Sequence, residues 1–311
     1  MKKNKKKNME NIYNTKSAVL FIIYKRKETT KKVFDKIRET KPKKLYVAAN
    51  APQPDNKAEE LKVKQTREVI ENVDWDCEVI KLYRTRHLNS HTSEIGAFNW
   101  FFEHETEGII LEDDCVPDNS FFRFCDELLE KYRDDTRIGT ISGTNSQFGN
   151  NRTDYSYYFS KFGHSWGWAT WKNVWDKFQN TMIQWPQIKK LNLLQDINSN
   201  KLFVNNWTKK FDSQYSNPSS WDTQFVLTLF LNNYLNIIPA YNLVKNIGTQ
   251  DSAHNMENNP YVNMNITPVS FPLNHPPFFI IDRKADNYRQ IHVFNANNIF
   301  KRILNRFVLN H

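Results

Sequence analysis

Short apolar runs alternate with polar or amphipathic segments through the first third of the chain. The runs are too short for typical helices, so they predict strands at 18–23, 45–49, 77–83 and 108–111, of which the first and the last are expected to be buried. Between the first two runs, Val33, Phe34 and Ile37 recur at helical spacing, and further helices are expected at 57–71 and around 95–100. This alternation is typical of βαβ units. It predicts an α/β fold with a mostly parallel central sheet flanked by helices.

Three consecutive acids, Glu112, Asp113 and Asp114, follow the fourth apolar run. Adjacent carboxylates repel one another unless a cation or hydrogen bonds compensate them. In open α/β sheets, ligands bind at the carboxyl ends of the strands, and Mg²⁺ is commonly held by one or two carboxylates together with phosphate oxygens. The acids therefore favour a metal–diphosphate site. An acidic turn that helps to cap the next helix would explain them as well.

Arginines also follow the predicted strands. Arg26 comes after the first strand, and Arg84 and Arg86 come after the third. Arginine makes paired hydrogen bonds to phosphate, so these side chains could neutralise a diphosphate opposite the metal. Exposed loop arginines are common and offer the alternative explanation.

The second half of the chain is dense in aromatic residues. A strand is expected at 138–142, and eleven tyrosines, phenylalanines and tryptophans then lie between 155 and 185. Trp166, Gly167 and Trp168 stand in a polar context, where aromatic faces can stack on sugar rings and glycine permits close backbone approach. We expect Trp166 or Trp168 to line a pocket. The tryptophans expected in the core are Trp171, Trp175 and Trp185.

Two further candidates lie towards the carboxyl end. Ser219 and Ser220 can cap a helix whose first turn contains Asp222, where the helix dipole favours a carboxylate. The functional alternative is that Asp222 is a general base that accepts a proton from a substrate hydroxyl. His254 lies in a loop; it is either a surface residue or a neutral ligand that completes a metal site.

Composition limits the other possibilities. The net charge of the 311 residues is +9, and Lys2, Lys3, Lys5, Lys6 and Lys7 contribute five of it, so residues 1–16 are expected to form a disordered basic tail. No nucleic-acid-binding module is visible. The three cysteines lack metal-site spacing, and neither a secretory signal nor a membrane-spanning run is seen. We therefore expect a cytoplasmic protein whose main domain spans 17–290.

The last residues, 291–311, are expected to form an amphipathic helix. Apolar residues recur between 299 and 308 among Lys301, Arg302 and Arg306. Such a helix can lie on an anionic membrane surface, so peripheral contact with the inner face of the membrane is one expectation. Docking on the body or on a second subunit is the alternative that we favour, and the oligomeric state stays open.

Several blocks of the sequence, taken in order, resemble the bacterial GT-A nucleotide-diphospho-sugar transferases that often carry a hemolysin-like label. A more distant similarity is to the animal N-acetylglucosaminyltransferase I family. The likeness spans residues 18 to 254 and continues weakly through 279–286. The blocks are FIIYKR (21–26), LYVAAN (45–50), VDW (73–75), IILEDDC (109–115), WGWATW (166–171) and NIG (246–248).

The resemblance implies a GT-A fold and a metal-dependent, inverting glycosyltransferase. It would move a sugar, a hexose or N-acetylhexosamine, from a nucleotide-diphosphate donor, expected to be UDP-linked, to a glycan or lipid-linked glycan hydroxyl, as in bacterial surface polysaccharide synthesis. The residue roles follow the same likeness. Asp114, with His254 nearby, would hold Mn²⁺ or Mg²⁺; Glu112 and Asp113 would bind ribose or donor-sugar hydroxyls; Arg26 and Asn50 would contact the nucleotide; Asp222 would be the base.

Two other functions compete with this interpretation. A sugar nucleotidyltransferase would need a glycine-rich phosphate loop with a lysine after the first strand, and residues 24–27 contain no glycine. A catalytically inert sugar-binding scaffold would bind sugar or nucleotide without turnover. The family also often carries Asp where this chain has Asn50, which leaves the choice of nucleotide open.

Overall fold

The first four strands form the parallel half of one sheet. The computed structural model describes residues 13–248 and 264–294. The strands are β1 (Val19–Ile23), β2 (Lys44–Ala49), β3 (Glu78–Tyr83) and β4 (Glu107–Glu112), in the order β3-β2-β1-β4. They alternate with the helices α1 (Lys27–Thr40), α2 (Lys57–Glu68, continued by a 3₁₀ turn, Val69–Asn72) and α3 (Ser90–His104). The predicted βαβ alternation is confirmed.

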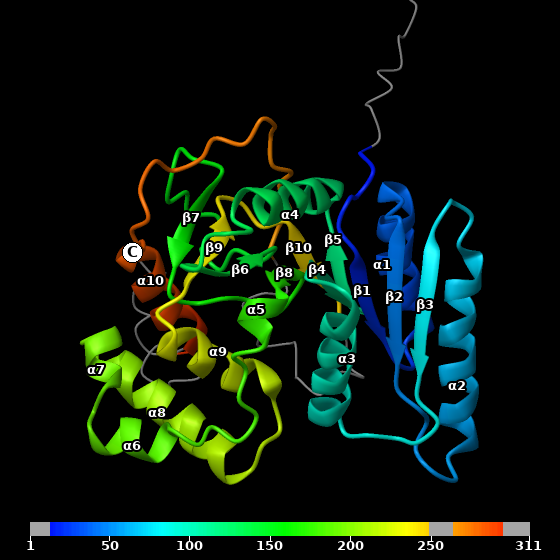
Figure 1. Cartoon of the computed structure of the whole chain (residues 1–311), viewed down its shortest axis with the longest axis horizontal. Helices are drawn as coiled ribbons and strands as arrows, with labels where there is room; N and C mark the ends of the chain where they lie inside the picture. The colour runs from blue at the N-terminus through cyan, green and yellow to red at the C-terminus, as the bar shows by residue number, and fades with distance from the viewer. Residues whose placement is uncertain (1–12, 249–263, 295–311) are drawn as a thin grey trace, which may run out of the picture.

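Four further strands extend the sheet beyond β4. They are β6 (Ile138–Ser142), β7 (Tyr157–Ser160), β8 (Trp168–Trp171) and β9 (Leu235–Pro239), in the order β8-β6-β9-β7. β8 runs antiparallel to both β4 and β6, and β7 runs antiparallel to β9, whereas β6 and β9 are parallel. The result is one eight-stranded, mostly parallel sheet (Figure 1), so the predicted fold class is confirmed.

A short antiparallel pair was not predicted. β5 (Cys115–Pro117), directly after the acidic turn, pairs with β10 (Val244–Asn246), and Asn246 lies opposite Cys115. A three-residue strand carries too little periodicity to be recognised in sequence. A helix cap follows it: Asp118 precedes α4 (Asn119–Lys131), and its side chain accepts a hydrogen bond of 2.8 Å from the backbone N–H of Ser120.

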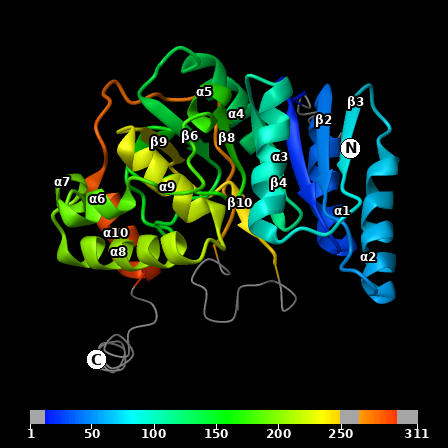
Figure 2. The same ribbon diagram turned by 60° about the horizontal axis from the view of Figure 1, so that its bottom comes forward.

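Helices of the second half gather on the side of the molecule opposite α1 and α2 (Figures 1 and 2). They are α6 (Trp185–Lys190), α7 (Leu194–Ile197), α8 (Lys201–Ser216), α9 (Trp221–Leu231) and α10 (Arg283–Phe294), and a short α5 (Lys172–Trp175) follows β8. α6, α8 and α9 share a small aromatic core with Phe162, in which Trp207 and Phe230 pack together. α9 contributes to both cores, because Trp221, Phe225 and Leu229 belong to the main core and Val226, Leu227 and Phe230 to this smaller one.

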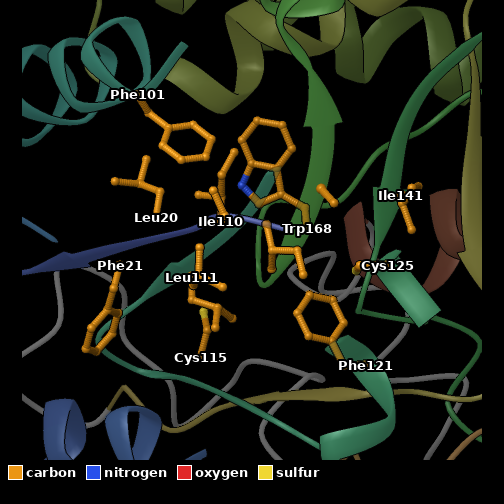
Figure 3. Packing of buried hydrophobic residues seen from close by; sticks show 14 of the residues in the cluster. Leu20, Phe21, Phe101, Ile110, Leu111, Cys115, Phe121, Cys125, Ile141 and Trp168 are labelled. Atoms are coloured by element: carbon orange, nitrogen blue, oxygen red, sulfur yellow. The ribbon is translucent and has the colours of Figure 1, made fainter. Parts of the chain in front are cut away.

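The main core covers both faces of β4. Figure 3 shows Phe101 of α3 on one side of the Ile110–Leu111 segment and Phe121 of α4 on the other, with Trp168 of β8 beside them. All five of these residues are at most 1% exposed. The predicted placement of Trp171, Trp175 and Trp185 in the core is also confirmed, because each is buried. The strand that ends in the acids is therefore held firmly on both sides.

Both ends of the described chain modify the expected boundaries. The Tyr13 hydroxyl and the Lys16 backbone N–H each donate a 2.7 Å hydrogen bond to Asp126 of α4, so the last residues of the expected tail pack on the body. α10 crosses the expected boundary at 290/291. The rest of the expected amphipathic helix, from 295, lies outside the described residues. Among the described residues, no helix combines the length and the apolar character needed to cross a bilayer.

Candidate functional site

The acidic triplet lies where β4 ends, and one arginine joins it. β1 and β4 are paired neighbours, with Ile22 opposite Glu112, so the loop after β1 emerges beside the acids. The Arg26 guanidinium lies 2.9 Å from Asp114 Oδ2 and also pairs with Asp113. A 3.3 Å hydrogen bond from the Tyr24 backbone N–H to Asp113 closes the same loop. These contacts fix Arg26 against two carboxylates at the carboxyl edge of the sheet.

Asp114 is also held from the side of β10. The Asn246 side-chain amide donates a 3.1 Å hydrogen bond to Asp114 Oδ1, and the Ile247 backbone N–H donates one of 2.7 Å to the Asp114 carbonyl. A Cβ added to Gly248 would lie 2.6 Å from Asp114 Oδ2, so glycine allows the backbone to approach the carboxylate. Residues 246–248 therefore form one wall of the acidic site. His254, the other expected metal ligand, lies outside the described residues.

A fourth acid, Glu94 of α3, was missed by the sequence interpretation. Its carboxylate accepts hydrogen bonds from the Ser90 hydroxyl and the Trp221 side chain. Burial raises the pKa of Glu94, and the nearby charges of Asp222 and Asp114 raise it further. A lone acid among Ile95, Ala97 and Phe98 was the available signal, but the sequence does not say which way a helix faces.

The acids outnumber the cations that neutralise them. Burial raises the pKa of Glu112 well above its ordinary value, and the neighbouring charges of Glu94 and the other two triplet acids add to this effect. Burial likewise raises the pKa of Asp113 to about 6, although Arg26 acts in the opposite direction. Within the described residues, four carboxylates therefore share this site with one guanidinium.

This surplus of carboxylate oxygens fits a divalent cation. Among the described residues, no group of three or more His, Cys, Asp or Glu side chains is placed so that it could hold a metal ion by itself. Mg²⁺ sites in nucleotide enzymes are commonly incomplete in this way, because phosphate oxygens and water supply the remaining ligands. The donor set is therefore suited to a cation that binds together with a diphosphate.

A cavity of about 200 Å³ opens beside Asp222. Two of its tryptophans, Trp168 and Trp221, stack with ring centroids 5.4 Å apart and an interplanar angle of 24°. Because Trp221 also donates to Glu94, the aromatic wall connects the cavity with the acidic site. The principal lining residues are Thr140, His164, Trp166, Trp168, Trp207, Lys210, Trp221, Asp222, Phe225 and Arg289.

The three residues of the Trp-Gly-Trp segment do not all face the cavity. Trp166 and Trp168 line the cavity, as expected of at least one of them, although Trp168 is also a core residue that is 1% exposed. Gly167, with φ +62°, faces β10 instead, and a Cβ there would lie 2.7 Å from a methyl group of Val244. Glycine at this position therefore allows the loop to pack closely against β10.

Asp222 occupies the first turn of α9, as expected, and its side chain is exposed at the cavity. Ser220 is the N-cap residue by position, but its hydroxyl bonds to Asp222 Oδ1 and does not cap the backbone, so the predicted serine cap is wrong. The Thr223 backbone N–H donates a 2.7 Å hydrogen bond to the same Oδ1. These contacts fix the orientation of the carboxylate.

Three other predicted residues lie apart from the acids. The Asn50 side chain donates to the Leu88 carbonyl at 2.7 Å and accepts from the Leu88 N–H at 3.1 Å, so it ties two loops together. Arg84 packs on Gly96 and donates a 3.2 Å hydrogen bond to the Ser93 carbonyl, and burial lowers its pKa. Arg86 is exposed. Of the three arginines, Arg26 is the one that contacts the acids within the described residues.

Comparisons with known proteins give little beyond the fold. No protein-family model and no curated protein matches the chain. HddC from Yersinia pseudotuberculosis aligns with 9% identity and a TM-score of 0.33, over 51% of this chain and 79% of that one. UDP-glucose pyrophosphorylase in complex with UDP-glucose aligns with 9% identity and a TM-score of 0.31, over 52% and 78% of the two chains.

A third similar structure is 4-diphosphocytidyl-2C-methyl-D-erythritolsynthase from Anaerococcus prevotii. It shares 9% identity with a TM-score of 0.38, over 76% of this chain and 92% of that one. At such identities a likeness concerns the fold alone, and TM-scores this low assign no activity. The function must be argued from the site.

Proposed function

We propose that this protein is a metal-dependent, inverting glycosyltransferase of the GT-A type. It would transfer a sugar from a nucleotide-diphosphate donor to a glycan hydroxyl, in keeping with bacterial surface polysaccharide synthesis. The observation that carries the proposal is the carboxylate-rich site at the end of β4, which lies beside an aromatic cavity that contains Asp222. The carboxylate-rich site suits a metal-bound diphosphate, and the aromatic cavity suits a sugar ring.

The donor would bind on the acidic side. Asp114 would hold Mn²⁺ or Mg²⁺, with His254 as a further ligand, and Glu112 and Asp113 would bind hydroxyls of the ribose or donor sugar. Arg26 already contacts Asp113 and Asp114 and could exchange part of this pairing for donor phosphate. When bound, the metal would stabilise the negative charge of the departing nucleoside diphosphate.

We also expect the loops after β2 and β3 to contribute to donor binding. Asn50 and Arg84 are expected to contribute to nucleotide binding. Their contacts with Leu88 and Ser93 suggest that they do so by holding the loop after β3 in place. A uridine nucleotide is the donor form that we test first.

The acceptor would bind on the cavity side, with its sugar against Trp166 and Trp168. Asp222 would remove the proton from the acceptor hydroxyl, whose oxygen forms a bond to the anomeric carbon. The bond from that carbon to the diphosphate breaks, and the electron pair leaves with the nucleoside diphosphate. One in-line displacement inverts the anomeric carbon. In the described structure the hydrogen bonds to Asp222 fall on Oδ1, so Oδ2 is our choice for the proton acceptor.

A panel of nucleotide sugars tests the proposal. The purified protein is incubated with each donor and Mn²⁺ or Mg²⁺, and nucleoside diphosphate release is measured with and without chelator. We expect release from at least one donor, and loss of release with chelator or in Asp114→Asn. Asp222→Asn should lose transfer to an acceptor but retain donor binding. Asp118→Asn, which alters an acid that caps α4 nearby, is the matched control and should remain active.

The same assay separates the competing functions. A nucleotidyltransferase would release pyrophosphate from a nucleoside triphosphate and a sugar phosphate. An inert scaffold would bind a nucleotide sugar and leave it intact. Either result, or diphosphate release that is unchanged in Asp114→Asn, would overturn the glycosyltransferase proposal.

A further inference from the structure

Helices α3 and α9 are joined by two polar contacts that lie one helical turn apart. The carboxylate of Glu94 on α3 accepts a hydrogen bond from the side chain of Trp221 on α9, whose donor is the indole N–H. Three residues before Glu94, His91 Nε2 lies 2.8 Å from Oε1 of Gln224, three residues after Trp221. Residues three apart share one side of a helix, so both contacts fall where the two helices face each other. The first turn of α9, which contains Asp222, is thus fixed to α3 at two points.

The contact between His91 and Gln224 is explained by helix packing alone. Both side chains are buried, with exposed fractions of 7% and 0%. The side-chain nitrogen of Gln224 donates a 2.8 Å hydrogen bond to the Asn180 carbonyl, so its oxygen is the atom that accepts from His91 Nε2. The donor and the acceptor of this amide are therefore both used in holding α9 against its neighbours.

Glu94 differs from His91 because it also lies close to the acidic site. Its charge interacts with those of Glu112 and Asp114, and with that of Asp222. The hydroxyl of Ser90, one turn earlier on α3, donates a hydrogen bond to the same carboxylate. Glu94 is therefore near both the acids expected to bind the donor and the carboxylate expected to act as the base, and two hydrogen bonds fix its orientation.

Trp221 transmits this fixed position to Asp222. The two residues are consecutive, so a shift of the indole moves the backbone that carries the carboxylate. The Trp221 ring also packs against Phe98, one turn after Glu94 on α3, with ring centroids 4.6 Å apart. At Asp222 itself, Oδ1 accepts hydrogen bonds from the Ser220 hydroxyl and the Thr223 backbone N–H. The connection from α3 to the carboxylate of Asp222 is therefore made of groups whose positions are each fixed.

We infer that Glu94 is a positioning residue, which holds Asp222 in place relative to the bound donor through its hydrogen bond with the Trp221 indole. The effect on transfer rests on the proposed glycosyltransferase function, whereas the fixing of the first turn of α9 does not. An in-line displacement needs the attacking oxygen, the anomeric carbon and the departing oxygen in line, and a misplacement of about 1 Å can lower the rate roughly 100-fold. Glu94 acts through Trp221 and takes no proton from the acceptor.

Two variants of Glu94 test this role. Glu94→Gln keeps an oxygen that can accept from Trp221 but removes the charge, whereas Glu94→Leu removes the acceptor at similar volume. We measure kcat for transfer, and the affinity for UDP with Mn²⁺ by calorimetry. Glu94→Leu should lower kcat about 100-fold and change the affinity less than about three-fold, and Glu94→Gln should stay within about five-fold in kcat. Glu103→Gln, at an exposed position of α3, is the matched control and should resemble the unaltered protein.

Three outcomes would overturn the inference. An equal loss of kcat in Glu94→Gln and Glu94→Leu would show that the charge of Glu94 takes part directly. A loss of affinity for UDP and Mn²⁺ in Glu94→Leu would place its effect at the donor, and an unchanged kcat would remove it from the reaction. If Glu94→Leu does not fold, Trp221→Phe removes the donor of the same hydrogen bond and keeps an aromatic ring. It should lower kcat, adding Glu94→Gln to it should cause no further loss, and additive losses would count against the inference.

A second measurement does not depend on turnover. Hydrogen–deuterium exchange of the full chain, read by mass spectrometry of the peptide that covers α9, reports on the turn that carries Asp222. Exchange there should be faster in Glu94→Leu than in Glu94→Gln or Glu103→Gln, because the turn loses one of its anchors. If the unaltered protein turns over no nucleotide sugar, the glycosyltransferase proposal fails, and this comparison still decides whether Glu94 fixes the turn. Equal exchange in all three variants would overturn the inference even in an active enzyme.

Discussion

Replacing Arg26 by methionine tests whether the acids after β4 are held together by one guanidinium. The side chain of Arg26 is 25% exposed, while those of Asp113 and Asp114 are 4% and 8% exposed. Methionine keeps much of the apolar stem but removes the charge. The variant therefore removes the guanidinium that contacts Asp113 and Asp114 and leaves both buried carboxylates in place.

The size of the effect follows from this burial. Removing one partner of a buried ion pair costs about 3–5 kcal/mol, and partial exposure of Arg26 places the expected loss near the lower limit, at about 3 kcal/mol. An unfolding entropy of roughly 2.1 cal/mol/K per residue gives about 0.6 kcal/mol/K for this chain. The melting temperature should therefore fall by about 5 °C.

The loss should depend on pH. The folded-state pKa of Asp113, about 6, lies above its unfolded value, so the folded protein binds the extra proton and stability falls as pH rises through this range. Without Arg26 the folded pKa rises further, and the destabilising range extends to higher pH. The loss of unfolding free energy caused by Arg26→Met should thus be larger at pH 8 than at pH 5.5.

Thermal unfolding with chelator present, followed by circular dichroism at both pH values, measures this deficit. Arg38→Met is the control, because it removes an ion pair with Asp74 whose side chains are 42% and 56% exposed. It should melt within about 1 °C of the unaltered protein at both pH values. If Arg26→Met lowers the melting temperature no more than Arg38→Met does, or by the same amount at both pH values, then Arg26 does not stabilise the acids.

Other predictions concern the site and its support. Gly248→Ala would place a Cβ 2.6 Å from Asp114 Oδ2, so nucleoside diphosphate release should fall at least ten-fold with a loss of stability of about 1–3 kcal/mol; full activity would contradict the close approach. Mn²⁺ should raise the melting temperature of the unaltered protein but not of Asp114→Asn, and equal shifts would argue against a metal ligand. Burial alone would raise the pKa of Glu59, but hydrogen bonds, Lys25 foremost, lower it to about 2. Glu59→Gln should therefore lose about 3 kcal/mol at pH 7, measured by urea unfolding, and the deficit should disappear as pH falls from about 4.5 towards 2.

Local patterns in the sequence determined much of the fold. The short apolar runs and the helical spacing between them identified β1 to β4 and their intervening helices, because strand-length apolar runs and helical periodicity are both local signatures. The helix cap formed by Asp118 is likewise local, since it depends on contacts within a few residues. The acids at the end of β4 were located because a strand end is itself a local feature.

Strand order, which the sequence pattern does not contain, decided which residues meet. Arg26 and Arg84 both follow strand ends, but β1 lies next to β4 and β3 lies three positions away. At about 4.8 Å per strand this is roughly 14 Å, too far for an arginine side chain to reach the acids. Only the tertiary structure distinguishes these two arginines.

Packing between distant segments decided the rest of the site. Glu94 meets Trp221 because α3 and α9 pack together, and Asn246 meets Asp114 because β10 pairs with β5. Lys210 and Arg289 share a cavity through the contact of α8 with α10. Periodicity shows that a residue belongs to a helix or strand, whereas the side chain it contacts depends on how whole elements pack, and that information is distributed over the entire core.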